Sequence, residues 1–165
     1  MIQNKANMEA KNNNGSTPLY LACEKNHKEI VNILLQNKAN IETKTKNGFS
    51  PLTYACEKGN LEVVNVLIQN KANMEAKNNN GSTPLYLACE KNHKEIVNIL
   101  LQNKANIETT NNFGWTPLLV VCELGYTEIV PLLIQSKVNL ETPNKIGCTP
   151  IYLACENNHP EIVNI

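Results

Sequence analysis

The stretch NNNGSTPLYLACEKNHKEIVNILLQNKANIETK, residues 12–44, decides the fold, because near-copies of it follow one another along the chain. Residues 2–43 are identical to residues 68–109. A Thr-Pro or Ser-Pro pair recurs every 33 residues, beginning at Thr17, Ser50, Thr83, Thr116 and Thr149. Such self-similarity is the sequence signature of a repeat architecture. We therefore predict one uninterrupted array and not a domain built around a single catalytic centre.

Local signals within this stretch predict a turn, a short helix, a second turn, a second helix and a long loop. Gly15 supplies the positive φ of the first turn, and Thr17 followed by proline marks a helix N-cap. Asn26, which is asparagine or glycine in every copy, accepts the left-handed conformation that ends a helix. The buried stripe of the second helix is predicted to contain Ile30, Val31, Leu34 and Leu35.

The run G-x-T-P-L-x-x-A-C-x-x-[N/G]-x-x-E-I-V-x-x-L-L resembles the ankyrin repeat over essentially the whole chain. The resemblance implies an all-α repeat solenoid of stacked helix-turn-helix units, with β-hairpin finger loops on one side and a concave groove that binds protein partners. Residues 1–165 then form a single array cut from a longer one. We place its units at 12–44, 45–77, 78–110 and 111–143, with 1–11 as the tail of a preceding unit and 144–165 as a truncated unit.

Two departures from the family pattern bear on the second helices. The glycine that usually ends this helix is replaced by lysine, so either Lys38 or the preceding Asn37, with their equivalents, takes the left-handed turn. The fourth unit carries Pro131 inside its second helix. Proline removes a backbone donor and clashes with the preceding turn, so we expect distorted first turns there unless Thr127 acts as the cap.

Composition excludes several classes of partner. All fifteen basic residues are lysine and all fifteen acidic residues are glutamate, for a net charge of zero. Without arginine, the usual reader of phosphate and guanine, we expect no nucleic-acid binding. No apolar stretch approaches membrane-spanning length, so we expect no membrane insertion, and we expect an intracellular, reducing compartment. Charge is unevenly distributed: residues 1–110 carry +3 and residues 111–165 carry −3.

The repeated CEKNH run (Cys23–His27) could in principle be half of a metal site, or a nucleophile with its base. Its histidine, however, is replaced by Asn60 in the second unit and by Tyr126 in the fourth. We therefore predict no metal, no cofactor and no catalytic residue. The cysteine takes a small buried position in each unit, and neighbouring helices lie too far apart for these thiols to form disulfides.

Candidate partner-binding residues come from the fingers and the first helices. The resemblance implies that finger residues beside the turn glycine face the groove, and these include both phenylalanines and the only tryptophan of the chain. Large aromatic residues on a surface built from polar ones are typical of an interface; the alternative is that they pack against neighbouring fingers. The predicted set is Lys46, Phe49, Phe113, Trp115, Ile146 from the fingers and Glu123, Leu124, Glu156 from the first helices.

Three functions compete at this point. The first is a non-catalytic protein-interaction module that binds a protein partner through its concave face. The second is a structural spacer or elastic element, which the duplicated block favours because copying adds length without a new contact surface. The third and weakest is an enzyme or a metal or thiol sensor. We expect a monomer, with weak end-to-end association through its uncapped ends.

Overall fold

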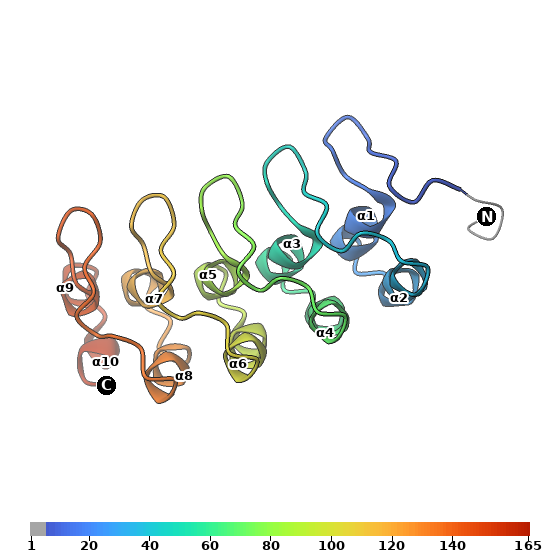
Figure 1. The fold of residues 1–165 in the computed structure, drawn as a ribbon. Coiled ribbons are helices and arrows are strands. Elements are labelled where there is room, and N and C mark those ends of the chain that lie inside the picture. The colour runs from blue at the N-terminus through green and yellow to red at the C-terminus, as the bar shows by residue number, and fades with distance from the viewer. Residues whose placement is uncertain (1–5) are drawn as a thin grey trace.

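A computed structural model describes residues 6–165, which contain ten helices and no strand. The helices are α1 Pro18–Glu24, α2 Lys28–Gln36, α3 Pro51–Lys58, α4 Leu61–Gln69, α5 Pro84–Glu90, α6 Lys94–Gln102, α7 Pro117–Leu124, α8 Val130–Gln135, α9 Pro150–Glu156 and α10 Pro160–Val163. Figure 1 shows five helix pairs side by side, with a finger loop rising beside each odd-numbered helix. The all-α repeat solenoid predicted from the sequence is confirmed. The expected β-hairpin finger loops are not found: the fingers are tight turns, and the described residues form no strand.

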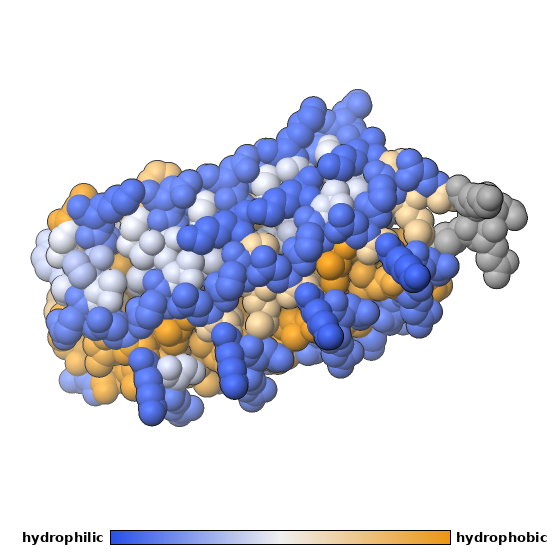
Figure 2. Space-filling view, in the orientation of Figure 1, coloured by the Kyte–Doolittle hydropathy of each residue, from blue (hydrophilic) through white to orange (hydrophobic). Residues whose placement is uncertain are grey.

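The odd-numbered helices form one row and the even-numbered helices a second row (Figure 1). Each odd helix packs against the next odd helix and against the even helix of its own pair. The first row carries the fingers, so any groove between fingers and helices is built from this row. Hydrophilic residues cover the finger side of the face seen in Figure 2, and an apolar band follows the even-numbered helices.

Each odd-numbered helix begins at the predicted cap. The N-cap side chain accepts a hydrogen bond from the backbone N–H three residues on, as Thr17 Oγ1 does from Tyr20 at 3.3 Å. Proline at the next position costs nothing, because the first N–H of a helix has no partner within the helix. The five caps are Thr17, Ser50, Thr83, Thr116 and Thr149.

In the first four pairs both helices are followed by a left-handed residue. After the odd helices this residue is the predicted asparagine or glycine, for example Asn26 with φ of 55°. After the even helices it is the lysine and not the preceding asparagine, as at Lys38 with φ of 66°. The side chain of Asn37 instead donates back to the Ile33 carbonyl at 2.8 Å, which satisfies one of the free carbonyls of the helix end.

Pro131 shortens the second helix of the fourth pair, as predicted. α8 begins at Val130 and has 6 residues, whereas α2, α4 and α6 have 9 each. Residues 127–129 form turns, and Ile129 is the N-cap residue, with no side-chain hydrogen bond. Thr127 therefore does not cap this helix. Proline occupies the first turn of α8, where it is tolerated.

The core is a continuous layer between the two rows of helices. At its two ends, two predictions about which residues are buried are wrong. Four repeat cysteines are buried as predicted, but Cys155 is exposed. Each thiol is covered by the helix pair that follows, and none follows α10 within the described residues. Ile30 is likewise exposed, whereas Ile96 at the same position is buried, because that position is covered by the preceding pair. The cysteines are free.

Candidate partner-binding groove

The fingers are rigid turns built around one side chain each. In the fourth finger, Asn111 Oδ1 accepts hydrogen bonds from the backbone N–H groups of Phe113 at 2.9 Å and Trp115 at 3.0 Å. Gly114 lies between them with φ of 82°, a conformation that residues with a Cβ rarely adopt. The turn therefore fixes the directions of the two aromatic side chains that the sequence singled out.

Neighbouring fingers are joined to one another by backbone hydrogen bonds. Lys46 N donates to Asn14 O at 3.0 Å, and Asn112 N donates to Asn80 O at 2.9 Å. The approach is so close that a Cβ on Gly81 would lie 2.8 Å from the Asn112 nitrogen. The first four fingers therefore form a continuous sheet-like wall without strand structure, and the side chains at its tips keep a constant spacing.

A groove of about 600 Å³ runs between this wall and the odd-numbered helices at the third and fourth pairs. It brings together four residues of the predicted set. Glu123 and Leu124 reach it from α7, and Phe113 and Trp115 reach it from the fourth finger. Its remaining lining includes Asn80, Ser82, Tyr86, Glu90, Lys91, Asn111, Val120 and Tyr126.

The other predicted residues lie elsewhere along the same face. Lys46 and Phe49 line a separate groove of about 400 Å³ at the first and second pairs. Ile146 lines a third depression, of about 320 Å³, between the fourth and fifth fingers, together with Phe113 and Trp115. Glu156 is exposed and lines none of these three.

The aromatic finger residues differ in how they are packed. Phe113 is 63% exposed. Trp115 is partly buried and packs against the hydrophobic core. Phe49 is also partly buried, with its ring edge-on to Tyr54 at 5.9 Å between centroids. Of the two interpretations left open by the sequence, presentation fits Phe113, whereas packing accounts for much of the surface of the other two.

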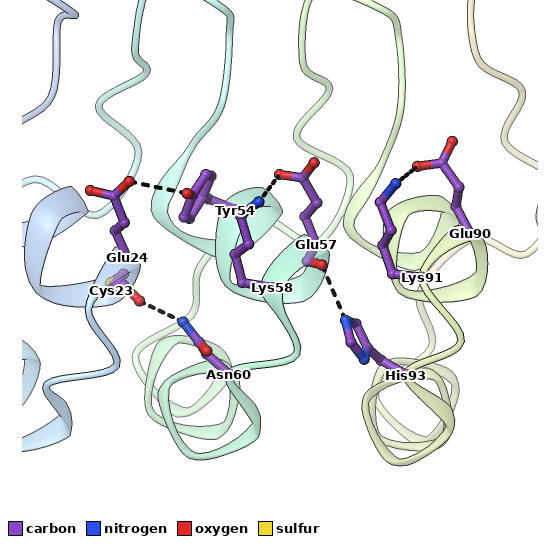
Figure 3. A network of polar contacts seen from close by, with 9 residues as sticks. All are labelled: Cys23, Glu24, Tyr54, Glu57, Lys58, Asn60, Glu90, Lys91 and His93. Atoms are coloured by element: carbon purple, nitrogen blue, oxygen red, sulfur yellow. Dashed lines mark hydrogen bonds and ion pairs between the residues drawn. The ribbon is translucent and has the colours of Figure 1, made fainter.

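Sequence reasoning missed the role of the tyrosines in the first groove. Tyr54 donates a hydrogen bond to Glu24 at 3.1 Å (Figure 3), and its ring lies 5.0 Å from that of Tyr20. The Lys58 ammonium lies 5.2 Å above the Tyr54 ring, a favourable cation–π geometry. Burial, and then the bond to Glu24, raise the pKa of Tyr54 to about 12. Tyrosine at adjacent positions of neighbouring repeats was the available signal.

The histidine of CEKNH has a structural task that the sequence did not reveal. His93 Nε2 donates to the carbonyl of Glu57 in the preceding pair at 3.1 Å, and His159 does the same to Glu123 at 2.9 Å. Asn60 replaces histidine by donating its Nδ2 to the Cys23 carbonyl at 2.8 Å (Figure 3). These side chains satisfy carbonyls at the end of an odd helix, which have no partner within that helix.

The thiols and the carboxylates have no arrangement typical of a reactive centre. Burial raises the pKa of the Cys23 thiol to about 12 and also raises that of Cys56, which disfavours the nucleophilic thiolate. Within residues 6–165, no three histidine, cysteine or glutamate side chains gather as metal ligands would. The pKa of Glu123 is raised, mainly because burial removes its carboxylate from water and also because of the negative charge of Glu156.

A series of hydrogen bonds, which we call the loop ladder, links the long loops of neighbouring repeats. Glu42 Oε1 accepts from the backbone N–H of Asn73 at 2.7 Å, and Glu75 accepts from that of Asn106 at 2.8 Å. The same bond joins Glu9 to Asn40 and Glu108 to Asn139. A charged acceptor makes such a bond stronger than a neutral one. The loop ladder holds neighbouring repeats at a constant spacing. Its residues do not line the grooves described above, so it leaves the groove residues free to contact a partner.

Comparisons with known proteins agree with this geometry. The family described as "Ankyrin repeats (3 copies)" matches residues 1–78, 38–111 and 100–165. A search of curated proteins finds no match. Ankyrin repeats generally act in protein–protein interaction and are typically non-catalytic. Within residues 6–165, no helix has the length and apolar character needed to cross a bilayer. The stacked helix pairs, the finger loops and the match over the whole chain together show that the chain belongs to the ankyrin repeat family.

Proposed function

We propose that the chain is a non-catalytic interaction module that binds a protein segment along the groove between its fingers and its odd-numbered helices. The observation that carries this proposal is the exposed apolar surface at the fourth and fifth fingers. Phe113 is 63% exposed and Ile146 is 83% exposed. Phe113 lines one groove with the exposed Leu124 and a second depression with Ile146. Burying such side chains is worth roughly 25 cal/mol per Å² of apolar surface, which gives a partner a reason to bind there.

Each residue of the predicted set then has a place in the proposal. Phe113, Leu124 and Ile146 supply apolar contact, and Trp115, which packs against the core, lines the same two depressions as Phe113. Glu123 and Glu156 supply charge near one end of the groove. The remaining members, Lys46 and Phe49, lie in the groove at the first two pairs and would contact a partner only if its bound segment extends that far along the array.

A structural spacer is the second candidate. It is favoured by the identity of residues 2–43 and 68–109 and by bonds that recur at every repeat junction, such as those of Glu42 and Glu75. A spacer needs uniform stacking and no exposed contact residues. The two candidates therefore differ in whether surface substitutions in the groove have any effect on binding.

The test uses a displayed library of random peptides, selected on the intact chain. Peptides that bind are measured again with the variant Phe113→Ser/Ile146→Ser, and we expect most of the affinity to be lost. The matched control is Ile30→Ser/Ile33→Ser, which removes two exposed isoleucines from α2, outside the groove. Circular dichroism verifies that each variant keeps its helices. A selection that yields no peptide, or peptides that bind both variants equally, would overturn the proposal and favour the spacer.

A further inference from the structure

The row of glutamates along the odd-numbered helices changes character between the third and fourth pairs. In the first three pairs each carboxylate has a partner, as Figure 3 shows. Glu24 accepts from the Tyr54 hydroxyl at 3.1 Å, Glu57 pairs with Lys58 at 4.0 Å, and Glu90 pairs with Lys91 at 3.2 Å. In this part of the array each of these carboxylates therefore has a partner from the chain itself, a hydroxyl at Glu24 and a lysine at Glu57 and Glu90.

In the last two pairs the partner residues are gone. The position after Glu123 holds Leu124 instead of lysine, and the position after Glu156 holds Asn157. None of the ion pairs within residues 6–165 involves either carboxylate. The finger lysine of the fifth pair, Lys145, donates to the Asn112 carbonyl at 2.6 Å.

The two unpaired carboxylates interact with each other. Glu123 is partly buried, and the negative charge of Glu156 raises its pKa further. The two glutamates occupy the same repeat position on α7 and α9, and these helices pack against each other. A positive side chain placed between them would relieve the repulsion of their like charges. Lys91 lines the same groove as Glu123, but it is paired with Glu90.

The apolar surface lies next to these charges. Phe113, Trp115 and Leu124 line the same groove as Glu123. At the first two pairs, by contrast, Phe49 packs on Tyr54 and Tyr54 on Tyr20. Unpaired negative charge and exposed apolar side chains therefore coincide at the fourth and fifth pairs, and this coincidence identifies the kind of partner that fits.

We propose that this end of the groove binds a partner segment that carries a lysine or arginine side chain between Glu123 and Glu156, next to a large apolar side chain that contacts Phe113 and Ile146. The inference rests on the proposed function, since it specifies the chemistry of what the groove takes. The cation would occupy the place that Lys58 and Lys91 hold in earlier repeats, supplied here by the partner. The first three pairs, whose carboxylates already have partners within the chain, would not select such a residue.

The test reads the sequences and affinities of the peptides selected above. Peptides whose binding is lost with Phe113→Ser/Ile146→Ser should share a lysine or arginine near an apolar residue. The variant Glu123→Gln/Glu156→Gln should bind them about tenfold more weakly, and added salt should weaken binding to the native chain. The control Glu95→Gln/Glu161→Gln removes two exposed carboxylates from even-numbered helices and should leave affinity unchanged.

The last step of the test replaces the positively charged residue of the peptide. Replacing its lysine or arginine by methionine should weaken binding to the native chain but have little further effect with Glu123→Gln/Glu156→Gln. Groove-dependent peptides that lack a cation, or that bind the glutamine variant as tightly as the native chain, would overturn this inference while the proposed function stands. A selection without groove-dependent peptides would overturn both.

Discussion

The imidazole of His93 lies directly on Gly59 of the preceding helix pair, and a Cβ on that glycine would lie 2.6 Å from the ring. The same relationship joins His159 to Gly125. Where the left-handed residue is Asn26, the residue one repeat further on is Asn60, and its amide donates to the Cys23 carbonyl, one residue before the carbonyl position that the histidine ring reaches elsewhere. The alternation of glycine and asparagine in the sequence is therefore coupled to the residue one repeat further on.

This coupling predicts a non-additive pair of substitutions. Gly59→Asn keeps a residue that tolerates positive φ, but its Cβ collides with His93, so the variant should be destabilised. In the double variant Gly59→Asn/His93→Asn the pair matches Asn26 and Asn60, and part of the stability should return. We expect an interaction free energy of about 1 kcal/mol or more, within the range found for residues in contact. Urea denaturation of all four proteins measures it, and simple additivity would contradict the coupling.

The loop ladder predicts that identical substitutions have different effects at different repeats. Glu75→Ala removes the acceptor of the Asn106 N–H and should lower the free energy of unfolding by about 1 kcal/mol, a typical value for one hydrogen bond. Glu141 occupies the same repeat position but follows the last described ladder bond, so Glu141→Ala is the matched control. Equal melting temperatures for the two variants would show that the ladder adds nothing to stability.

From the environment of Glu123 we predict that the free energy of unfolding depends on pH. Its pKa in the folded state is raised, so the folded chain holds this proton more tightly than the unfolded chain. The contribution of Glu123 to stability should therefore be fully present below the ordinary glutamate pKa of about 4.3 and be lost as pH rises through the raised value. Glu123→Gln should remove this contribution and be the more stable protein at pH 7, with little difference at pH 4. Urea denaturation across this range, with Glu141→Gln as a charge-matched control, measures the effect.

From the burial of the six cysteines we predict two classes of thiol reactivity. Cys23, Cys56, Cys89 and Cys122 are buried, whereas Cys148 and Cys155 are not. An aromatic disulfide reagent at mildly alkaline pH should modify the last two rapidly and the buried four only after unfolding, because reaction needs an accessible thiolate. Cys148→Ala/Cys155→Ala should abolish the fast phase. A fast phase larger than two thiols per chain would mean that the stack opens readily.

Much of the architecture could be predicted from local sequence. The caps at Thr17 and its equivalents, the left-handed ends of the odd-numbered helices and the distorted start of α8 at Pro131 all depend on backbone preferences of one or two residues, and such preferences do not need a partner. The left-handed end of the even-numbered helices stayed open between Asn37 and Lys38, and the structure places it at Lys38. The periodic cysteine was read correctly as a core residue at four positions. At Cys155 it was not, because burial in a solenoid is supplied by the neighbouring repeat and not by the residue itself.

The types of residue in the candidate groove could be proposed from the sequence, but their arrangement in space could not. The sequence singled out the finger aromatics and the helix glutamates, yet it treated them as one set. Their separation into grooves, with Phe49 packed on Tyr54 and Phe113 exposed, depends on which side chain stands opposite in the next repeat. Likewise the replacement of His93 by Asn60 looked like evidence against any role. Both side chains instead bond a carbonyl at the end of the preceding odd-numbered helix, that of Cys23 for Asn60 and that of Glu57 for His93.

The sequence by itself determined the repeat period, the order of turns and helices and the family, because these follow from local conformational preferences copied every 33 residues. The tertiary structure decided what lies one repeat away from each residue. That neighbour determines whether Cys155 is covered, whether the Glu24 carboxylate accepts from Tyr54 and whether the Glu57 carbonyl has His93 as a donor. These contacts join residues thirty or more positions apart, so no local pattern specifies them until the stack is formed.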